Sequence, residues 1–172
     1  MNRRVTDLAL GDHYFFITGM LLVLSAIAAK LKFGENVQRV LVKIRTWSVL
    51  SLIALVSVGL ALLSLKFLFG RKRPHIDPAY ESLHFEPFNL HWNWHSFPSG
   101  HSQVIFVVAT LLGLLIPKAK WPLLIFALAI ALTRVVTQQH FLSDVLVGSA
   151  LGYLGTKWVH AWFASTRFGR NL

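Results

Sequence analysis

Residues 47–74 read WSVLSLIALVSVGLALLSLKFLFGRKRP. No charged residue interrupts residues 47–65, and a basic cluster follows from Lys66 to Arg73. A helix needs about 20 mostly apolar residues to cross a bilayer, and lipid tolerates only backbone whose polar groups are hydrogen-bonded internally. The stretch therefore predicts a transmembrane helix that ends in positive charge.

Four further apolar stretches have similar lengths. Besides Trp47–Phe69, the candidates are Tyr14–Leu31, Ser99–Ile116, Trp121–Val136 and Asp144–Phe163. We expect an all-α polytopic membrane bundle of about five transmembrane helices, forming a single domain over residues 1–172. The first stretch lacks a small-residue cleavage site and is followed by Lys30 and Lys32, which favours a retained span over a signal peptide. Residues 37–45 carry apolar and basic sides at helical spacing, which predicts a short helix on the membrane surface.

The composition narrows the function classes. Of the 172 residues, 55% are hydrophobic, 14% are charged and none is cysteine, which excludes a disordered chain, a disulfide scaffold and thiolate chemistry. The net charge of +10 arises from 17 basic against 7 acidic residues. Because the basic residues lie mostly between apolar runs, topology and lipid headgroups explain them better than nucleic acid does.

The charged residues also predict an orientation. One face carries Lys30, Lys32, Arg39, Lys43, Arg45, Lys118, Lys120, Lys157, Arg167 and Arg170 against the single acid Glu35. The other carries Arg3, Arg4, Lys66, Arg71, Lys72, Arg73 and Arg134 with the remaining acids. The positive-inside rule places the first face and the C-terminus in the cytoplasm, and the loops 70–98 and 134–143 outside. In a bacterial inner membrane these loops face the periplasm.

Ionisable residues at helix ends gather at three points on the outward face: Lys66–Pro74, Pro98–His101 and Arg134–Asp144. Each group has an ordinary structural explanation when it is taken alone. Lys66 can snorkel, Ser99 with Gly100 can be a helix cap, and His140 with Asp144 can be an interfacial pair. Their joint occurrence at one depth instead favours a shared functional site.

The three groups together suit phosphoryl transfer. Lys66, Arg73 and Arg134 supply cations for the phosphoryl oxygens, and Ser99 and Gly100 open a helix whose free N–H groups and dipole add donors. The arrangement needs neither a metal nor another cofactor.

Two histidines complete the catalytic set. His140 can be the nucleophile if Asp144, one turn further on, accepts a hydrogen bond from its other ring nitrogen. His101 can be the general acid. Because one histidine must be neutral while the other is protonated, a bell-shaped rate profile is expected.

These residues resemble the type 2 phosphatidic acid phosphatase family, whose pattern is K-x6-RP, PSGH and SR-x5-H-x3-D. The chain reads Lys66 to Arg73-Pro74, Pro98 to His101, and Thr133-Arg134 to His140 to Asp144, with Thr133 as the one departure. The resemblance implies a phosphohistidine on His140, with His101 as acid, Asp144 as orienting group and no metal. It further implies that phosphate is bound by Lys66, Arg73, Ser99, Gly100 and Arg134. Family members usually have six spans, and the missing one would precede residue 14.

The resemblance leaves the substrate open among lipid phosphate monoesters and pyrophosphates. The candidates are the 1-phosphate of lipid A, undecaprenyl pyrophosphate, phosphatidylglycerol phosphate and phosphatidic acid, and the chain is most similar to the lipid A 1-phosphatase group. The alternatives are a lipid phosphotransferase, a non-catalytic lipid-binding protein and a haloperoxidase. The partners expected are the lipid substrate and membrane lipids, without nucleic acid, and a monomer is favoured.

Two further patterns carry alternatives. The loop His75–Phe97 holds Tyr80, Phe85, Phe88, Trp92, Trp94 and Phe97, which form either an aromatic belt or a lid over the substrate. Its histidines, His75, His84, His91 and His95, could suggest a metal site, but Pro78 and Pro87 interrupt the segment. Gly148 and Gly152 favour close helix packing within the bundle over homodimerisation.

Overall fold

A computed structural model describes residues 11–31, 33–76 and 82–169 of the chain. It contains five α-helices: α2 (Gly11–Ala28), α3 (Glu35–Phe69), α4 (Gly100–Leu115), α5 (Lys120–Val136) and α6 (Leu142–Ser165). Three single 3-10 turns, η1 (Pro74–Ile76), η2 (Trp92–Trp94) and η3 (Pro117–Ala119), lie in the connections. The described residues contain no β-strand, and this confirms the all-α helical membrane bundle. Outside these ranges lie Arg3, Arg4, Lys32, Pro78, Tyr80 and Arg170.

The helices occupy the five apolar stretches that the sequence indicates. Among the described residues, three segments are long and apolar enough to cross a membrane: α2, α3 and Pro117–Val136. α4 is a shorter apolar helix of 16 residues, and α6 has 24 residues, with glycine, serine and threonine among the buried ones. α4 and α6 are the helices that pack against most of the bundle, so fewer of their side chains need to face lipid.

The prediction of a separate surface helix over residues 37–45 is wrong. These residues form the first turns of α3, which runs without a break for 35 residues. No glycine or proline separates them from the span, and Thr46 and Ser48 return their hydroxyls to the carbonyls of Val42 and Ile44, at 2.9 and 2.8 Å. At 1.5 Å per residue, α3 is about 52 Å long and exceeds a hydrocarbon core of about 30 Å.

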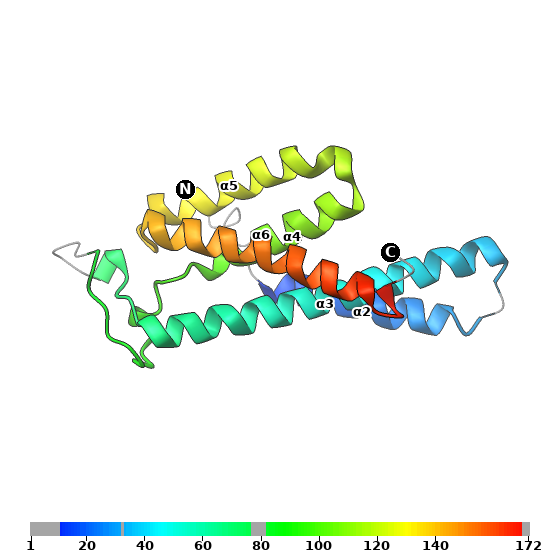
Figure 1. Ribbon diagram of the computed structural model, residues 1–172, viewed down its shortest axis with the longest axis horizontal. Helices are drawn as coiled ribbons and strands as arrows, with labels where there is room; N and C mark the ends of the chain where they lie inside the picture. Colours follow the sequence, from blue (N-terminus) through cyan, green and yellow to red (C-terminus); the bar gives the residue numbers. More distant parts are fainter. Residues whose placement is uncertain (1–10, 32, 77–81, 170–172) are drawn as a thin grey trace.

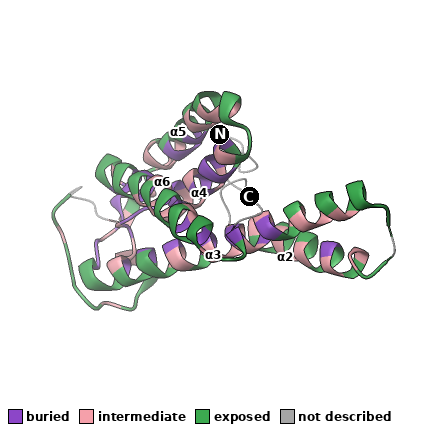
Figure 2. Ribbon diagram, turned by 45° about the vertical axis from the view of Figure 1, so that its right-hand side comes forward, coloured by how far each residue is buried: buried purple, intermediate pink, exposed green. Residues whose placement is uncertain are grey.

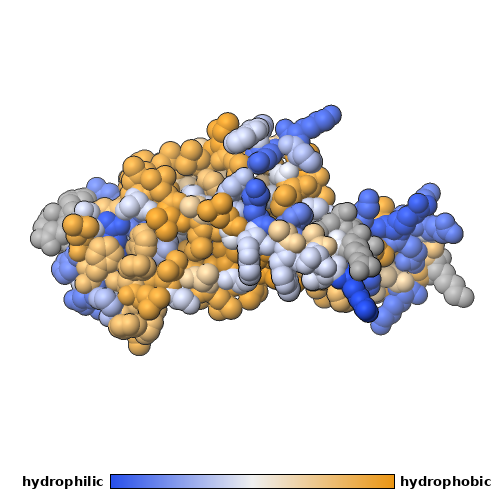
Figure 3. Space-filling model, in the orientation of Figure 1, coloured by the Kyte–Doolittle hydropathy of each residue, from blue (hydrophilic) through white to orange (hydrophobic). Residues whose placement is uncertain are grey.

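The chain folds as a packed bundle with a projecting hairpin (Figure 1). α4, α5, α6 and the second half of α3 lie together, whereas α2 and the first half of α3 form the hairpin that extends to the right. In Figure 2 the buried positions gather in the bundle, and the hairpin is mostly exposed. Hydrophobic side chains cover much of the bundle's flank in Figure 3, and hydrophilic ones gather at the tip of the hairpin. This distribution suits a bundle surrounded by lipid.

Two apolar clusters hold the bundle together. The first joins α3, α4 and α6 through Leu50, Ala54, Leu55, Val58, Val107, Leu111, Val159 and Phe163. The second joins α4, α5 and α6 through Ile105, Ala109, Ala127, Ile130, Ala131 and Val145. The clusters fix how the ends of these four helices sit relative to one another.

Glycines set the closest approach of α6 to α4. A Cβ atom on Gly148 would overlap the backbone of Ser99, and one on Gly152 would overlap the backbone of Gln103. The predicted role of this G-x-x-x-G pair in packing within the bundle is therefore confirmed. The contact also ties the start of α4 directly to α6, where the two helices carry residues of the candidate site.

Candidate active site

Four helix termini meet at the end of the bundle shown on the left of Figure 1. α3 ends there with Lys66, α4 begins there after Ser99, α5 ends there with Arg134, and α6 begins there with Asp144 in its first turn. The described parts of the following loop, residues 70–76 and 82–98, pass over the same end. The up-and-down connectivity thus brings together three motifs that are far apart in sequence.

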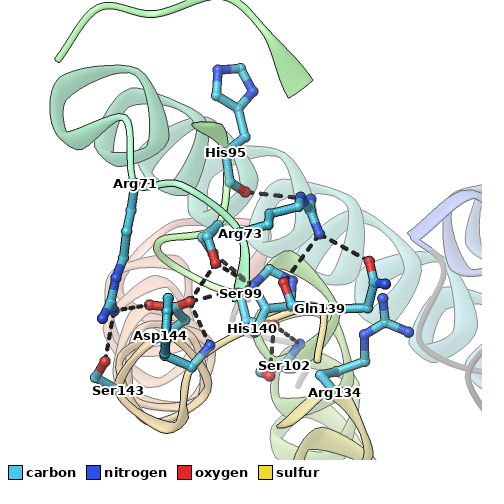
Figure 4. A network of polar contacts seen from close by, with 12 residues as sticks. Arg71, Arg73, His95, Ser99, Ser102, Arg134, Gln139, His140, Ser143 and Asp144 are labelled. Carbon is cyan, nitrogen blue, oxygen red and sulfur yellow. Dashed lines mark hydrogen bonds and ion pairs between the residues drawn. The ribbon is translucent and has the colours of Figure 1, made fainter. Parts of the chain in front are cut away.

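Asp144 is the centre of a buried polar network (Figure 4). Its side chain is 0% exposed, and its Oδ2 accepts hydrogen bonds from Ser96 Oγ at 2.6 Å and from the Phe141 N–H at 2.9 Å. Its Oδ1 forms an ion pair with the guanidinium of Arg71. Its backbone carbonyl accepts from the N–H of Ser99 at 3.0 Å. Asp144 therefore links the loop, α4 and α6 through its side chain and its backbone carbonyl.

Arg71 is the counter-ion of Asp144. Besides the carboxylate, its guanidinium donates to Ser143 Oγ at 2.8 Å and to the carbonyl of Ser82. The rings of Phe141 and Phe85 lie 4.1 and 5.4 Å from it, at distances at which aromatic faces attract a cation. A buried carboxylate without such a partner would be strongly disfavoured, and Arg71 supplies the compensating charge.

His140 lies beside this network and is only 3% exposed. Its Nδ1 is 2.7 Å from the carbonyl oxygen of Ser96 and 3.7 Å from Asp144 Oδ2. A carbonyl can only accept, so Nδ1 carries the proton and Nε2 of the neutral ring keeps its lone pair. The expected direct hydrogen bond from His140 to Asp144 is thus replaced by one to a backbone carbonyl, with the carboxylate nearby. Burial lowers the pKa of His140 to about 4, which keeps the ring neutral.

Three further cations, Lys66, Arg73 and Arg134, lie near His140. Lys66 Nζ donates to the carbonyl of His95 at 2.6 Å, and Arg73 reaches the carbonyls of His95 and Gln139 only at 3.5 and 3.4 Å. Arg134 carries a buried Nε with no hydrogen-bond partner. Burial and the charge of Arg134 lower the pKa of Arg73 to about 10, so it remains charged at neutral pH. Figure 4 shows Arg73 and Arg134 on one side of His140 and Arg71 beyond Asp144 on the other.

The PSGH segment forms the start of α4. Ser99 caps the helix, and its Oγ accepts from the N–H and the hydroxyl of Ser102 at 3.4 and 2.9 Å. The N–H of Ser99 donates to the backbone carbonyl of Asp144, so it is not one of the free donors at the start of α4. Gly100 and His101 follow as the first helical residues, where backbone N–H groups have no acceptor within the helix. A Cβ on Gly100 would lie 4.0 Å from Lys66 Cε, so the glycine opens the site beside the lysine.

The charge of the site is unbalanced. Among the described residues Asp144 is the one buried carboxylate, and Arg71 is paired with it. Lys66, Arg73 and Arg134 remain, close enough to one another and to His101 for their charges to interact. Within the described part of the chain these three clustered cations have no carboxylate partner, so they form an anion site, and guanidinium groups suit phosphate oxygens.

The loop before α4 is held by its own aromatic and histidine side chains. The ring of Phe88 packs edge-on against Phe67, those of Phe85 and Phe97 against Phe69, and Trp92 lies 4.5 Å from the Arg73 guanidinium. His91 accepts from the N–H of Asn93, and His95 contacts the carbonyl of Asn89. Among the described residues no group of three His, Cys, Asp or Glu side chains could hold a metal ion. The contacts to Arg73 join this loop to the anion site.

Two residues of the site do not stand out in the sequence. Arg71 lies inside the basic cluster, but nothing in its spacing marks it as the partner of Asp144, 73 positions later. Ser96 precedes the PSGH segment and supplies both its hydroxyl to Asp144 and its carbonyl to His140. A serine or arginine near a motif is too common to be singled out, and only the path of the loop reveals these contacts.

The sequence pattern of the PAP2 superfamily matches residues 45–168. The chain is 35% identical to a lipid A 1-phosphatase of Rhizobium johnstonii over 106 residues, which are 62% of this chain and 40% of that protein. It is 36% identical to a lipid A 1-phosphatase of Rhizobium etli over 94 residues, 55% of this chain and 40% of the relative.

A third relative has a different name. The bacitracin transport permease protein BcrC of Bacillus licheniformis is 34% identical over 64 residues, 37% of this chain and 32% of that protein. The chain thus spans about 40% of the lipid A 1-phosphatases it matches. No solved structure matches it significantly.

The fold and the site define a helical membrane protein with a buried histidine beside an anion site. The match over residues 45–168 shows that the chain belongs to the PAP2 superfamily.

Proposed function

We propose that the chain is a membrane lipid phosphatase that hydrolyses a lipid phosphate monoester or pyrophosphate through a phosphohistidine on His140. The observation that carries the proposal is the cluster of Lys66, Arg73 and Arg134 beside a neutral, buried histidine. The cluster offers a positive site for the phosphoryl group, uncompensated among the described residues, and the histidine offers a lone pair.

In the first step Nε2 of His140 attacks phosphorus, a P–N bond forms, and the P–O bond to the leaving group breaks. His101 gives its proton to the departing oxygen. The imidazole becomes positively charged while Nδ1 keeps its proton, so the Ser96 carbonyl and the Asp144 carboxylate stabilise the intermediate. The three cations hold the charge on the phosphoryl oxygens through the transition state.

In the second step water attacks phosphorus and the neutral His101 takes its proton. The P–N bond breaks, its electron pair returns to Nε2, and orthophosphate leaves. Neither step uses a metal or a redox group. Ser99 and Gly100 belong to the phosphate site through the backbone at the start of α4, with the N–H of Gly100 as a donor and the side chain of Ser99 as the helix cap.

The names of the two rhizobial relatives favour lipid A phosphorylated at position 1 as the substrate. Undecaprenyl pyrophosphate, phosphatidylglycerol phosphate and phosphatidic acid share the same reacting group and are the other candidates. The charge asymmetry supports an orientation in a bacterial inner membrane with this site toward the periplasm and the C-terminus in the cytoplasm.

The test measures orthophosphate release by detergent-purified protein in EDTA from a panel of these four lipids. His140→Ala is compared with His13→Ala, which alters an exposed histidine at the start of α2. We expect release by the wild type and by His13→Ala, and none above background by His140→Ala.

Two outcomes would contradict the proposal. Equal activity in both variants would remove His140 as the nucleophile. Transfer of labelled phosphate to a second lipid, without orthophosphate release, would establish a phosphotransferase instead.

A further inference from the structure

A pocket lies between α4, α5 and α6, at the end of the bundle opposite to the anion site. Its walls include Gly113 of α4, Lys120 of α5, and Tyr153 and Lys157 of α6, and we call it the lysine pocket. From Gly100 of the anion site to Gly113, α4 rises about 20 Å at 1.5 Å per residue. Figure 1 shows the turn between α4 and α5 at this opposite end. The lysine pocket is therefore separate from the candidate active site.

The turn between α4 and α5 brings Lys120 into the pocket. Gly113 allows the close approach, since a Cβ added there would lie 3.3 Å from the Cα of Lys120. The Nζ of Lys120 lies 5.0 Å from the centre of the Trp121 ring and 6.0 Å from that of Tyr153 on α6. A lysine that only marks a helix end extends its ammonium group away from the bundle into the headgroup layer. Lys120 instead is half-buried and turned toward a neighbouring helix.

A second cation faces the same ring. Lys157 lies one turn after Tyr153 on the same side of α6, and its Nζ is 5.7 Å from the centre of the Tyr153 ring. Within the described part of the chain, neither Lys120 nor Lys157 pairs with a carboxylate or donates a side-chain hydrogen bond, and the Tyr153 hydroxyl has no hydrogen-bond partner. The lysine pocket is therefore positively charged and has unused donors.

The depth of the pocket matches the headgroup layer of a membrane. Trp121 and Trp158 directly follow the two lysines in sequence and are 68% and 71% exposed. Exposed tryptophan is typical of the interface between hydrocarbon and water, where headgroup phosphates lie. In the orientation proposed above, this interface belongs to the cytoplasmic leaflet.

The size and the lining suit a phosphate group that carries an apolar tail. The volume is about 60 Å³, and one water needs about 10–15 Å³ of such a volume, so there is room for a group of about five atoms. Ammonium groups and a phenol hydroxyl donate readily to phosphate oxygens. Leu114 and Leu124 form an apolar part of the wall, against which the carbon atoms next to a lipid phosphate can pack. A free phosphate ion would leave this part of the wall unused.

We propose that the lysine pocket binds the phosphate group of an anionic phospholipid such as phosphatidylglycerol. Among the described residues, no histidine or carboxylate lines the pocket, so the lipid is bound and not cleaved. Its negative charge compensates Lys120 and Lys157 and thereby ties the start of α5 to α6. A zwitterionic phospholipid binds less well, because its own cation meets these lysines. The inference does not depend on the proposed function.

The test compares two double variants of the full chain, each of which removes two positive charges from the same end of the bundle. Lys120→Gln with Lys157→Gln removes the charge of the lysine pocket. Lys118→Gln with Arg167→Gln is the matched control and alters two exposed residues outside the pocket lining. Binding of phosphatidylglycerol and of phosphatidylcholine is titrated in detergent and measured by native mass spectrometry, which resolves each bound lipid. Inorganic phosphate is added in a parallel titration.

We expect the wild type to bind phosphatidylglycerol more tightly than phosphatidylcholine. The Kd for phosphatidylglycerol should rise about tenfold or more in the pocket variant and change by less than about twofold in the control. An excess of inorganic phosphate should leave the lipid in the lysine pocket. Both double variants should hydrolyse butyl phosphate, a water-soluble phosphate monoester, at the wild-type rate, because the pocket lies about 20 Å from the anion site.

Four results would overturn the proposal. An equal rise of the Kd in both double variants would mean that the lipid responds only to the total charge of this end. Equal affinity of the wild type for the two lipids would mean that the headgroup charge is not recognised. Displacement of the lipid by inorganic phosphate would assign the pocket to a free phosphate ion. Loss of butyl phosphate hydrolysis together with lipid binding in the pocket variant alone would mean that the pocket is not separate from the anion site.

Discussion

The packed end of the bundle and the α2–α3 hairpin are built on different principles. α6 buries eight residues, among them Asp144, Gly148 and Gly152, whereas α2 buries only Ser25. In the packed end, helices touch at backbone atoms and the buried carboxylate is paired with a cation, so a change of a few atoms is expected to alter stability or activity. In the hairpin most side chains face outward, where lipid can replace one apolar contact by another. The candidate catalytic residues therefore lie where packing is specific, whereas the hairpin needs only apolar character and shape.

The largest effect is expected at the centre of the packed end. Asp144→Asn keeps the shape but removes the charge that Arg71, Ser96 and His140 face. By analogy with the loss of an orienting carboxylate in other histidine-dependent enzymes, kcat should fall about 10³-fold or more. Circular dichroism and steady-state kinetics measure the fold and the rate together. A folded variant with near-normal kcat would mean that the Ser96 carbonyl alone orients His140.

Arg134→Lys should have the next largest effect. Lysine keeps the charge but loses the planar fork and the Nε–H, which has no protein partner in the structure. We expect kcat/KM to fall about 10²-fold, as when one donor to a developing oxyanion is lost. Lys43→Arg, on the hairpin half of α3, is the matched control and should be neutral. Similar kinetics for Arg134→Lys and wild type would show that this position supplies only charge.

Gly148→Ala probes packing without touching a charge. Its methyl group would overlap the backbone of Ser99, and overpacking of this kind costs about 1–3 kcal/mol. Thermal unfolding in detergent should show lower stability, and activity should fall because the start of α4 is displaced. Gly19→Ala in the hairpin meets no atom within 4 Å and should be neutral or slightly stabilising. Equal behaviour of the two variants would contradict the contrast between the regions.

Burial also sets the pH dependence of the packed end. The nucleophile must be neutral, and burial lowers the pKa of His140 from 6.5 to about 4. Its contribution to kcat/KM is therefore retained as the pH falls from 6.5 to 5 and is lost, about tenfold per pH unit, only below about 4. The profile is measured with a phosphate ester, and the substrate's own titration is measured separately. After that correction, an acid limb centred near 6.5 would indicate a solvated histidine.

The smallest effect is expected on the outer side of the hairpin. Phe16 is 72% exposed, and Phe16→Ala should change the free energy of unfolding by no more than about 0.5 kcal/mol in detergent. Activity on butyl phosphate should also be unchanged. A loss of more than about 2 kcal/mol would mean that this face packs against protein, which a second copy of the chain could supply.

Much of the fold follows from the sequence because lipid imposes a strong pattern. Apolar runs of about 20 residues in lipid must be helices or closed barrels, and these five form helices. The predicted ends lie within a few residues of the observed ones, except at the start of α3. There the amphipathic spacing of residues 37–45 is as compatible with a continuous helix as with a surface one. Spacing describes which side is apolar, and it does not say whether the helix bends.

The sequence motifs identify the residues of the candidate site, but they do not predict the hydrogen bonds and ion pairs between them. Lys66, Arg73, Ser99, Gly100, His101, Arg134, His140 and Asp144 all lie at one end of the bundle, where the sequence places them. The partners of Asp144 and His140 depend on how the loop between α3 and α4 folds back, and that path is set by contacts such as Phe85 on Phe69. The roles assigned to these residues and the monomeric state stay predictions.

The most direct test of the central claim is to trap the covalent intermediate. Wild-type protein and His140→Ala are mixed with a phosphorus-labelled lipid phosphate, denatured at alkaline pH, where a phosphoramidate bond survives, and digested for mass spectrometry. The account predicts one labelled peptide, with phosphate on His140, and no label in the variant. Orthophosphate release by wild type without a labelled His140, or a label that persists in His140→Ala, would contradict it.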